Sequence, residues 1–187
     1  YLQKVQSMNH FMYWGTFDWV AVAIKQARAL DALASAKGPS ALAPLYCYPV
    51  PIKGTMATTD LPSSAGFASL HTRLAKTDSE LVTLVRRANG VLFGKTNVPE
   101  LARSLATGNY ANGLAFSAWG YDSMVGGSSG GSAAAVSAYS AAVAITEDTG
   151  GSTNAPATRS HVFGYDPPKF HCASAASRLA SRLASRL

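Results

Sequence analysis

Apolar residues recur at three- and four-residue steps near the start of the chain, between residues 18 and 36. Charged side chains fall largely off this stripe, as expected for a helix with one buried face. The sequence Lys37-Gly38-Pro39 then breaks the pattern. We therefore predict an amphipathic helix from Asp18 to Ala36 that packs on a sheet through these residues: Val20, Ala23, Ile24, Ala27, Leu30 and Ala34.

Strand and helix patterns alternate over the next sixty residues. Residues 46–53 predict a strand that ends in a turn, and a polar connection follows it. The sequence Thr77-Asp78-Ser79-Glu80 has the form of a capping box, which predicts a helix that closes at Asn89-Gly90. Residues 91–94 are continuously apolar, as in a strand buried on both faces, and a further short helix is predicted from Asn97 to about Ala106.

The second half of the chain is richer in glycine, serine and alanine. We expect a loop over 107–125, a helix over 132–140 capped by Ser132, and a buried strand over 141–145. Strands that alternate with helices of 10–15 residues are typical of an α/β fold. The predicted fold class is therefore α/β, with a mixed, largely parallel sheet flanked by helices.

The last part of the chain differs from the rest. Residues 1–168 are expected to form one domain, whereas 169–187 form a tail in which Ser-Arg-Leu-Ala repeats. On a helix this repeat aligns leucines beside arginines, and it would suit an acidic partner or a membrane surface. A stray extension without a function is the alternative.

Composition narrows the function classes. The 187 residues are 48% hydrophobic and 14% charged, which is typical of a folded domain with a core. The net charge is +6, but half of it comes from the arginines of the tail. Because no basic stripe interleaved with aromatic residues is present, nucleic-acid binding is not expected.

Cysteine use and hydropathy bear on the compartment. Cys47 and Cys172 are far apart in sequence, and two free buried thiols in a reducing compartment are favoured over a disulfide. No run of 18 apolar residues would span a membrane. A soluble, intracellular protein is therefore favoured. The alternative is an organelle, because the chain begins at Tyr1 and not at Met, as it would if a targeting peptide had been cleaved or left out.

The strongest chemical signal lies in two glycine-serine clusters. GGSSGGS occupies residues 126–132, and Gly150-Gly151-Ser152 follows after an Ala/Val-rich segment. Glycines beside a serine let backbone N–H groups approach a ligand closely. Two such clusters bring hydroxyls and amide donors together, as acyl transfer requires of a nucleophile and an oxyanion site.

These clusters resemble those of the amidase signature family, in which GGSSGGS precedes a D-[TI]-G-G-S-[IV]-R-x-P segment. Two upstream runs carry the same resemblance: Pro49-Val50-Pro51-Ile52-Lys53, and Gly94-Lys95-Thr96-Asn97-Val98-Pro99-Glu100. The four motifs occur in the family's order and cover roughly residues 20 to 168. The resemblance implies a partial amidase-signature fold that acts without a metal or another cofactor.

The resemblance also implies a catalytic role for each motif. Ser152 would be the nucleophile, and Ser128, which follows a cis peptide bond in the family, would bridge it to Lys53 as the base. Lys53 would have to be neutral, so burial in its apolar run must lower its pKa from about 10.4. The backbone N–H groups of Thr149, Gly150 and Gly151 would hold the oxyanion, and Ser129 would support the cluster by hydrogen bonding.

Several positions depart from the family pattern. Asn154 replaces an arginine, Gly54 replaces an acidic residue, and Glu147 adds a carboxylate beside the nucleophile loop. Family enzymes also continue well beyond the length of this chain. Two interpretations follow: an amidase that cleaves a small-molecule amide, or an inactive amidase-like chain that serves as a structural subunit. In either case we expect a protein partner to cover the incomplete fold.

The sequence fits three other kinds of site less well. Residues 127–131 fit the G-x-S-x-G nucleophile elbow, and Asp148 or Asp166 and then His161 or His171 follow in hydrolase order, but residues 120–124 form a poor preceding strand. A phosphate loop is excluded because no G-K-[ST] sequence ends the glycine cluster. His171-Cys172 lacks a second ligand pair at zinc spacing, so no metal site is expected.

Overall fold

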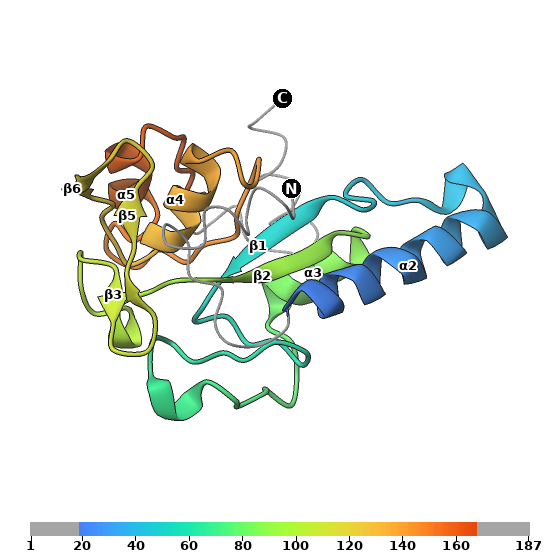
Figure 1. Ribbon diagram of the computed structural model, residues 1–187. Coiled ribbons are helices and arrows are strands. Elements are labelled where there is room, and N and C mark those ends of the chain that lie inside the picture. The colour runs from blue at the N-terminus through green and yellow to red at the C-terminus, as the bar shows by residue number, and fades with distance from the viewer. Residues whose placement is uncertain (1–18, 168–187) are drawn as a thin grey trace.

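The structure is a computed structural model that describes residues 19–167 (Figure 1). The predicted boundary between residues 1–168 and the tail over 169–187 lies outside the described residues, and so does the tail itself.

Two short parallel strands form the centre of the fold, as the sequence predicts. β1 (Pro49–Lys53) pairs with β2 (Val91–Thr96), with a register shift between Val50 and Ile52. β1 starts later than expected, because residues 45–48 form a turn in which Tyr48 N–H donates to the Leu45 carbonyl at 2.8 Å. β2 continues past the predicted end at Gly94. The chain is confirmed as α/β with a largely parallel central sheet.

A third segment pairs with the other edge of β1. Ile145 forms an isolated parallel bridge with Ile52, and Ile145 N–H donates to the Pro51 carbonyl at 3.0 Å. The strand predicted over 141–145 is therefore reduced to this bridge. The bridge still matters for function, because it places the segment after residue 145 beside the carboxyl end of β1.

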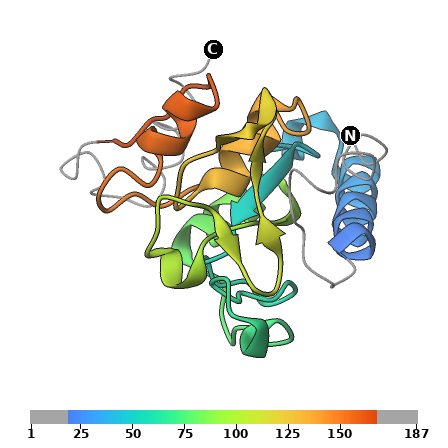
Figure 2. The same cartoon turned by 60° about the vertical axis from the view of Figure 1, so that its left-hand side comes forward.

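Helix α2 (Trp19–Lys37) is confirmed and covers the free edge of β2. Trp19 packs edge-on against Phe93 with ring centroids 5.1 Å apart, and the Gln26 side chain accepts a hydrogen bond from Leu92 N–H at 2.9 Å. Covering an edge strand in this way prevents further pairing. The predicted apolar stripe is only partly buried, since Ile24 is 37% exposed and the end of α2 projects beyond the sheet (Figures 1 and 2).

Helix α3 (Glu80–Arg87) is also confirmed, but its predicted capping box is wrong. The N-cap is Ser79, and no side-chain hydrogen bond caps the helix. Asp78 is used elsewhere: it accepts from Thr59 N–H at 2.8 Å and from Arg86 Nε at 2.8 Å. The helix instead gains its stability by burying Val82, Leu84 and Val85.

The region between β2 and the first glycine cluster differs most from expectation. The helix predicted over 97–106 is only a 3-10 turn, η3 (Glu100–Ala102), because Leu101 and Ala102 adopt positive φ angles of 52° and 56°. The predicted loop over 107–125 holds two antiparallel hairpins instead. Their strands are β3 (Gly108–Asn109), β4 (Gly113–Leu114), β5 (Phe116–Ser117) and β6 (Gly120–Met124).

Two short helices follow the glycine clusters. α4 (Gly130–Ser137) starts and ends earlier than the predicted helix over 132–140, and α5 (Asn154–Arg159) was not predicted. α4 lies against the end of β2 without a gap: a Cβ added at Gly131 would lie 2.4 Å from Asn97 N. Two further 3-10 turns complete the elements, η1 (Pro39–Ala41) and η2 (Ala68–Leu70).

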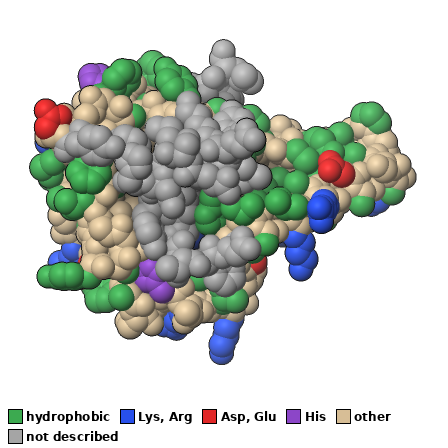
Figure 3. Space-filling model, viewed as in Figure 1, with side chains coloured by type: hydrophobic (Ala, Val, Ile, Leu, Met, Phe, Trp, Pro, Cys, Tyr) green, Lys and Arg blue, Asp and Glu red, His purple; other side chains and the backbone are tan. Residues whose placement is uncertain are grey.

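The surface has a conspicuous apolar side. Hydrophobic side chains gather along α2 and at the β3–β6 end of the molecule (Figure 3). A groove of about 710 Å³ is lined by Trp119, Tyr139, Phe163 and their neighbours, and Phe163 is 93% exposed. Within residues 19–167, no helix is both long and apolar enough to cross a membrane.

Candidate active site

Lys53 is the last residue of β1, and its side chain is almost completely buried, with 1% exposed. Its Nζ lies 2.8 Å from Ser128 Oγ and donates to the Glu147 carbonyl at 3.1 Å. Burial lowers the pKa of Lys53, and the negative charges of Glu147 and Asp148 oppose this effect only in part. Lys53 therefore loses its proton more readily than an exposed lysine does, and the neutral amine is favoured.

The two serines named from the sequence continue the chain of contacts from this amine. Ser128 Oγ donates to Ser152 Oγ at 3.0 Å, and the peptide bond between Gly127 and Ser128 is cis. Ser128 is buried, whereas Ser152 is half-buried. The contacts thus lead from a buried amine to the hydroxyl of a half-buried serine.

Asp148 holds the loop that carries Ser152. Its carboxylate accepts from Gly151 N–H at 2.6 Å and Ser152 N–H at 3.0 Å, and its second oxygen accepts from the N–H groups of Thr153 and Asn154 at 2.7 and 3.3 Å. Burial by itself would raise the pKa of Asp148, but these backbone hydrogen bonds outweigh it and lower the pKa below its usual value.

This arrangement corrects one expectation about the oxyanion site. The N–H of Gly151 already donates to Asp148, so it is not available to a ligand in this conformation. Thr149 and Gly150 are exposed, and in the described part of the chain no residue accepts a hydrogen bond from their N–H groups. Of the three expected donors, two therefore have no acceptor among residues 19–167.

The other two serines of the first cluster make different contacts. Ser129 N–H donates to the Ser152 carbonyl at 3.2 Å, so the hydrogen bond by which Ser129 joins the two clusters comes from its backbone, whereas its buried hydroxyl has no partner among residues 19–167. Ser132 lies inside α4 and does not cap it. Its Oγ is 2.6 Å from Thr96 Oγ1, which joins α4 to the end of β2.

The departures from the family pattern have local explanations. A Cβ at Gly54 would lie 2.8 Å from the Thr96 carbonyl oxygen, so an acidic side chain would not fit here without movement. The Glu147 carboxylate accepts a hydrogen bond from Thr55 Oγ1. Asn154 is exposed at the first turn of α5, and nothing in the structure explains why it stands in place of an arginine.

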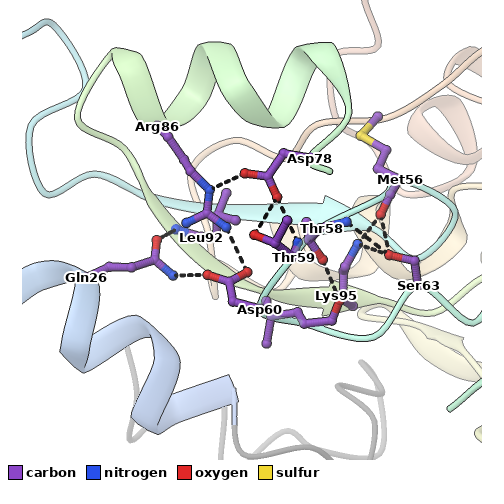
Figure 4. Close-up of polar contacts among 11 residues, drawn as sticks. Gln26, Met56, Thr58, Thr59, Asp60, Ser63, Asp78, Arg86, Leu92 and Lys95 are labelled. Atoms are coloured by element: carbon purple, nitrogen blue, oxygen red, sulfur yellow. Dashed lines mark hydrogen bonds and ion pairs between the residues drawn. The ribbon is translucent and has the colours of Figure 1, made fainter. Parts of the chain in front are cut away.

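A second buried lysine, Lys95, lies in the Gly94–Glu100 motif, and the resemblance implies no catalytic role for it. Lys95 Nζ donates to the Met56 carbonyl and to Ser63 Oγ, the latter at 3.2 Å (Figure 4). Burial lowers the pKa of Lys95 to about 7, against the attraction of Asp60 and other carboxylates. The position of Lys95 inside an apolar strand was the signal that could have identified it.

The alternative sites gain no support from this geometry. Residues 120–124 do form a strand, contrary to expectation, but it belongs to a small antiparallel hairpin. Within residues 19–167 no histidine hydrogen-bonds the serine cluster, and His161 packs against Trp119 with ring centroids 5.7 Å apart. In the same residues no group of three or more His, Cys, Asp or Glu side chains is placed to hold a metal ion. Cys47 is half-buried and free, and Cys172 lies outside the described residues.

Comparison with known proteins gives relatives over most of the chain. A glutamyl-tRNA(Gln) amidotransferase subunit from Acidothermus cellulolyticus is 39% identical over 145 residues, which are 78% of this chain and 28% of that protein. Its counterpart of the same name from Mycobacterium ulcerans is 40% identical over 147 residues, again 78% of this chain and 29% of its own length. The chain thus spans about three tenths of the length of the curated relatives that it matches.

Solved structures share the fold over 83% of this chain. A vestigial protein complex described as revealing the evolutionary origins of an s-triazine catabolic enzyme matches with a TM-score of 0.75 and 30% identity, over 34% of its own chain. The peptide amidase of Stenotrophomonas maltophilia matches with a TM-score of 0.73 and 28% identity, over 33% of its own chain.

The fold is therefore the amidase-signature fold in part, with the glycine-serine clusters and Lys53 at the carboxyl end of its central strands. The family model for amidases matches residues 1–176, which is most of the chain. The chain belongs to the amidase family.

Proposed function

We propose that this site cleaves a carboxamide C–N bond through a serine acyl-enzyme. The observation that carries the proposal is the unbroken series of contacts from Lys53 Nζ to Ser128 Oγ at 2.8 Å and on to Ser152 Oγ at 3.0 Å. A nucleophile within hydrogen-bond reach of a relay, which is in turn oriented by a base, is the arrangement that activates a hydroxyl. Burial of Lys53 favours the neutral amine that a base requires.

In the acylation step, Ser152 Oγ forms a bond with the amide carbonyl carbon. For this step the two hydroxyl hydrogens turn, so that Ser152 Oγ donates to Ser128 Oγ and Ser128 Oγ donates to neutral Lys53. The proton of Ser152 passes to Ser128, whose own proton passes to Lys53, and the carbonyl oxygen gains the negative charge. When the C–N bond breaks, the proton returns through Ser128 to the nitrogen, and the amine leaves. Water then attacks the ester by the same proton path, which releases the carboxylic acid and restores Ser152.

Two backbone donors are proposed to stabilise the oxyanion. The N–H groups of Thr149 and Gly150 have no acceptor in the described structure and belong to the residues three and two positions before the nucleophile. Each such donor contributes about 3 kcal/mol to transition-state stabilisation in comparable sites. Gly151 would become a third donor only after leaving Asp148.

A fluorophosphonate probe tests this proposal, because it reacts only with an activated serine. The folded chain should become labelled at one residue, and Ser152→Ala should remove the label. Lys53→Met should slow labelling by at least about 100-fold. Ser69→Ala, an exposed serine of η2, is the matched control and should label normally. An unlabelled wild-type chain whose circular dichroism shows that it is folded would overturn the proposal.

The apolar surface favours a second candidate, that of an inactive structural subunit. The groove at Trp119, Tyr139 and Phe163 exposes large apolar side chains, and a contiguous apolar surface of this kind marks an interface. We propose that a protein segment covers this side, whether or not the serines react. Light scattering of the purified protein, combined with the probe, distinguishes the two candidates. A chain that does not react with the probe and is found only in a stable complex supports the structural role.

A further inference from the structure

The proposed base and the proposed nucleophile lie on separate segments, which are joined next to the site. Lys53 N–H donates to the Ile145 carbonyl at 3.0 Å, and Ile145 N–H donates to the Pro51 carbonyl at 3.0 Å. These backbone contacts hold residue 145 against β1. Two residues further along the chain, the Glu147 carbonyl contacts the amine of Lys53 itself.

Glu147 adds two contacts with side chains to these backbone hydrogen bonds. Its carbonyl accepts from Lys53 Nζ at 3.1 Å, and its carboxylate accepts from Thr55 Oγ1, two residues after Lys53. A single residue therefore contacts both the base and the turn that follows it. Because Asp148 is the next residue and binds the N–H groups of the nucleophile loop, any displacement of Glu147 also displaces that loop.

The charges around Lys53 give the carboxylate a second effect. Within the described residues, the charged groups that act on the Lys53 amine are Glu147 and Asp148, and both favour its protonated form. Asp148 is neutralised in part by four backbone N–H groups. The Glu147 carboxylate has only a hydroxyl as its partner in the described structure, so its charge remains effective toward the amine.

We propose that Glu147 is a positioning residue for the amide-cleaving reaction: it fixes the Lys53 turn against the nucleophile loop and tunes the charge around the Lys53 amine. The inference rests on the proposed function, in which Lys53 is the base. It gives a role to the carboxylate by which this chain departs from the family sequence pattern.

Two substitutions separate the hydrogen bond from the charge. Glu147→Gln keeps an oxygen that can accept from Thr55 but removes the charge, whereas Thr55→Val removes the hydrogen bond and keeps the charge. Asp122→Asn, an exposed carboxylate on β6, is the control for a general effect of charge. Each variant is prepared as the full 187-residue chain and checked for folding by circular dichroism.

The first measurement is the NMR titration of the Lys53 amine, assigned with Lys53→Met. Glu147→Gln should move its midpoint to lower pH by about half a pH unit, a modest shift because the carboxylate is exposed. Thr55→Val and Asp122→Asn should leave the midpoint unchanged. A Glu147→Gln midpoint equal to that of the wild type would overturn the role of the charge.

The second measurement is the pH profile of fluorophosphonate labelling. Glu147→Gln should shift the rise in rate to lower pH by the same amount, while Thr55→Val should lower the rate about 10-fold at every pH. A wild-type rate in Thr55→Val would overturn the positioning role. If the wild-type chain does not label at all, the proposed function fails, but the amine titration still decides whether Glu147 tunes Lys53.

Discussion

Lys53 and Lys95 are two buried lysines on neighbouring parallel strands, yet their surroundings differ in kind. Lys53 is 1% exposed and Lys95 9%, and burial lowers the pKa of both. The Lys53 amine contacts a serine hydroxyl that leads to a second hydroxyl. The Lys95 amine donates to the Met56 carbonyl and to Ser63 Oγ, and Ser63 Oγ in turn donates to that same carbonyl (Figure 4).

The comparison shows that burial alone does not make a lysine a base for catalysis. Each amine contacts one serine hydroxyl and one backbone carbonyl, but the two serines lead to different groups. Ser63 Oγ donates to a carbonyl oxygen, which can only accept, so the contacts of Lys95 fix the 56–63 loop and lead to no nucleophile. Ser128 Oγ contacts a second hydroxyl, which both donates and accepts, so the contacts of Lys53 can pass a proton on. The group beyond the serine distinguishes the two amines, and the lowered pKa that they share does not.

The largest expected difference is in reactivity. Lys53→Met should slow fluorophosphonate labelling of Ser152 by at least about 100-fold, because the base is lost. Lys95→Met should change the rate by less than about 10-fold, since Lys95 makes no contact with either serine. Rate constants measured at pH 8 on folded protein check this. Equal losses in the two variants would contradict the distinction between the amines.

The next difference is in the pH dependence of stability. The pKa of Lys95 is about 7 in the folded chain and 10.5 for an unperturbed lysine. Between these values the unfolded chain binds the extra proton, so the free energy of unfolding should rise with pH, by roughly 4 kcal/mol for this group between pH 6 and pH 10. Urea unfolding of the wild type and of Lys95→Met from pH 6 to pH 10 measures it. Parallel curves for the two proteins would show that Lys95 is not the source.

Asp148→Asn tests only the site that contains Lys53 and Ser152, and not the surroundings of Lys95. The substitution places an NH₂ group opposite backbone N–H donors, which should cost about 2 kcal/mol in stability and slow labelling of Ser152. Because the pKa of Asp148 is lowered in the folded state, its contribution is present above its usual pKa of 3.8 and is lost as the pH falls through the lowered value. Urea unfolding at pH 7 and pH 3 should therefore show a larger difference between variant and wild type at pH 7.

The smallest expected effect concerns the serines beside each amine. Ser63→Ala should lower the free energy of unfolding by about 1 kcal/mol without changing the labelling rate, because among residues 19–167 its hydroxyl forms hydrogen bonds only with Lys95, Met56 and Thr58. Ser128→Ala should do the reverse and prevent labelling at little cost in stability. Thermal unfolding and probe labelling of both variants check the pair. Loss of labelling in Ser63→Ala would link the two lysines.

The sequence predicted best where one local pattern decides the structure. The 3.6-residue apolar stripe of α2 and the continuous apolar run of β2 both form as expected. The juxtaposition of Lys53, Ser128 and Ser152 was expected from the resemblance of the motifs to the amidase signature family. No local pattern of residues would have placed these three side chains together.

The failures occurred where tertiary contacts outweigh local preference. The region after β2 contains good helix formers, but Asn97 accepts from Asn109 and donates to the Gly113 carbonyl, and these contacts hold it in a loop. The capping box failed because the helix begins at Glu80, so that Ser79 and not Thr77 is the N-cap. The hydrogen bond from Gly151 N–H to Asp148 could not be predicted either, because it depends on the path of a loop and not on residue type.

The close approach of α4 to β2 has a consequence for how this chain can vary. At Gly131 even a methyl group would meet the backbone of Asn97, and backbone cannot rotate away as a side chain can. Every substitution at residue 131 must push α4, the helix that follows Ser128, away from β2. β2 is the neighbour of β1, the strand that carries Lys53. In a deep mutational scan, residue 131 should thus be as intolerant as the reactive groups themselves, although it contributes no atom to the chemistry.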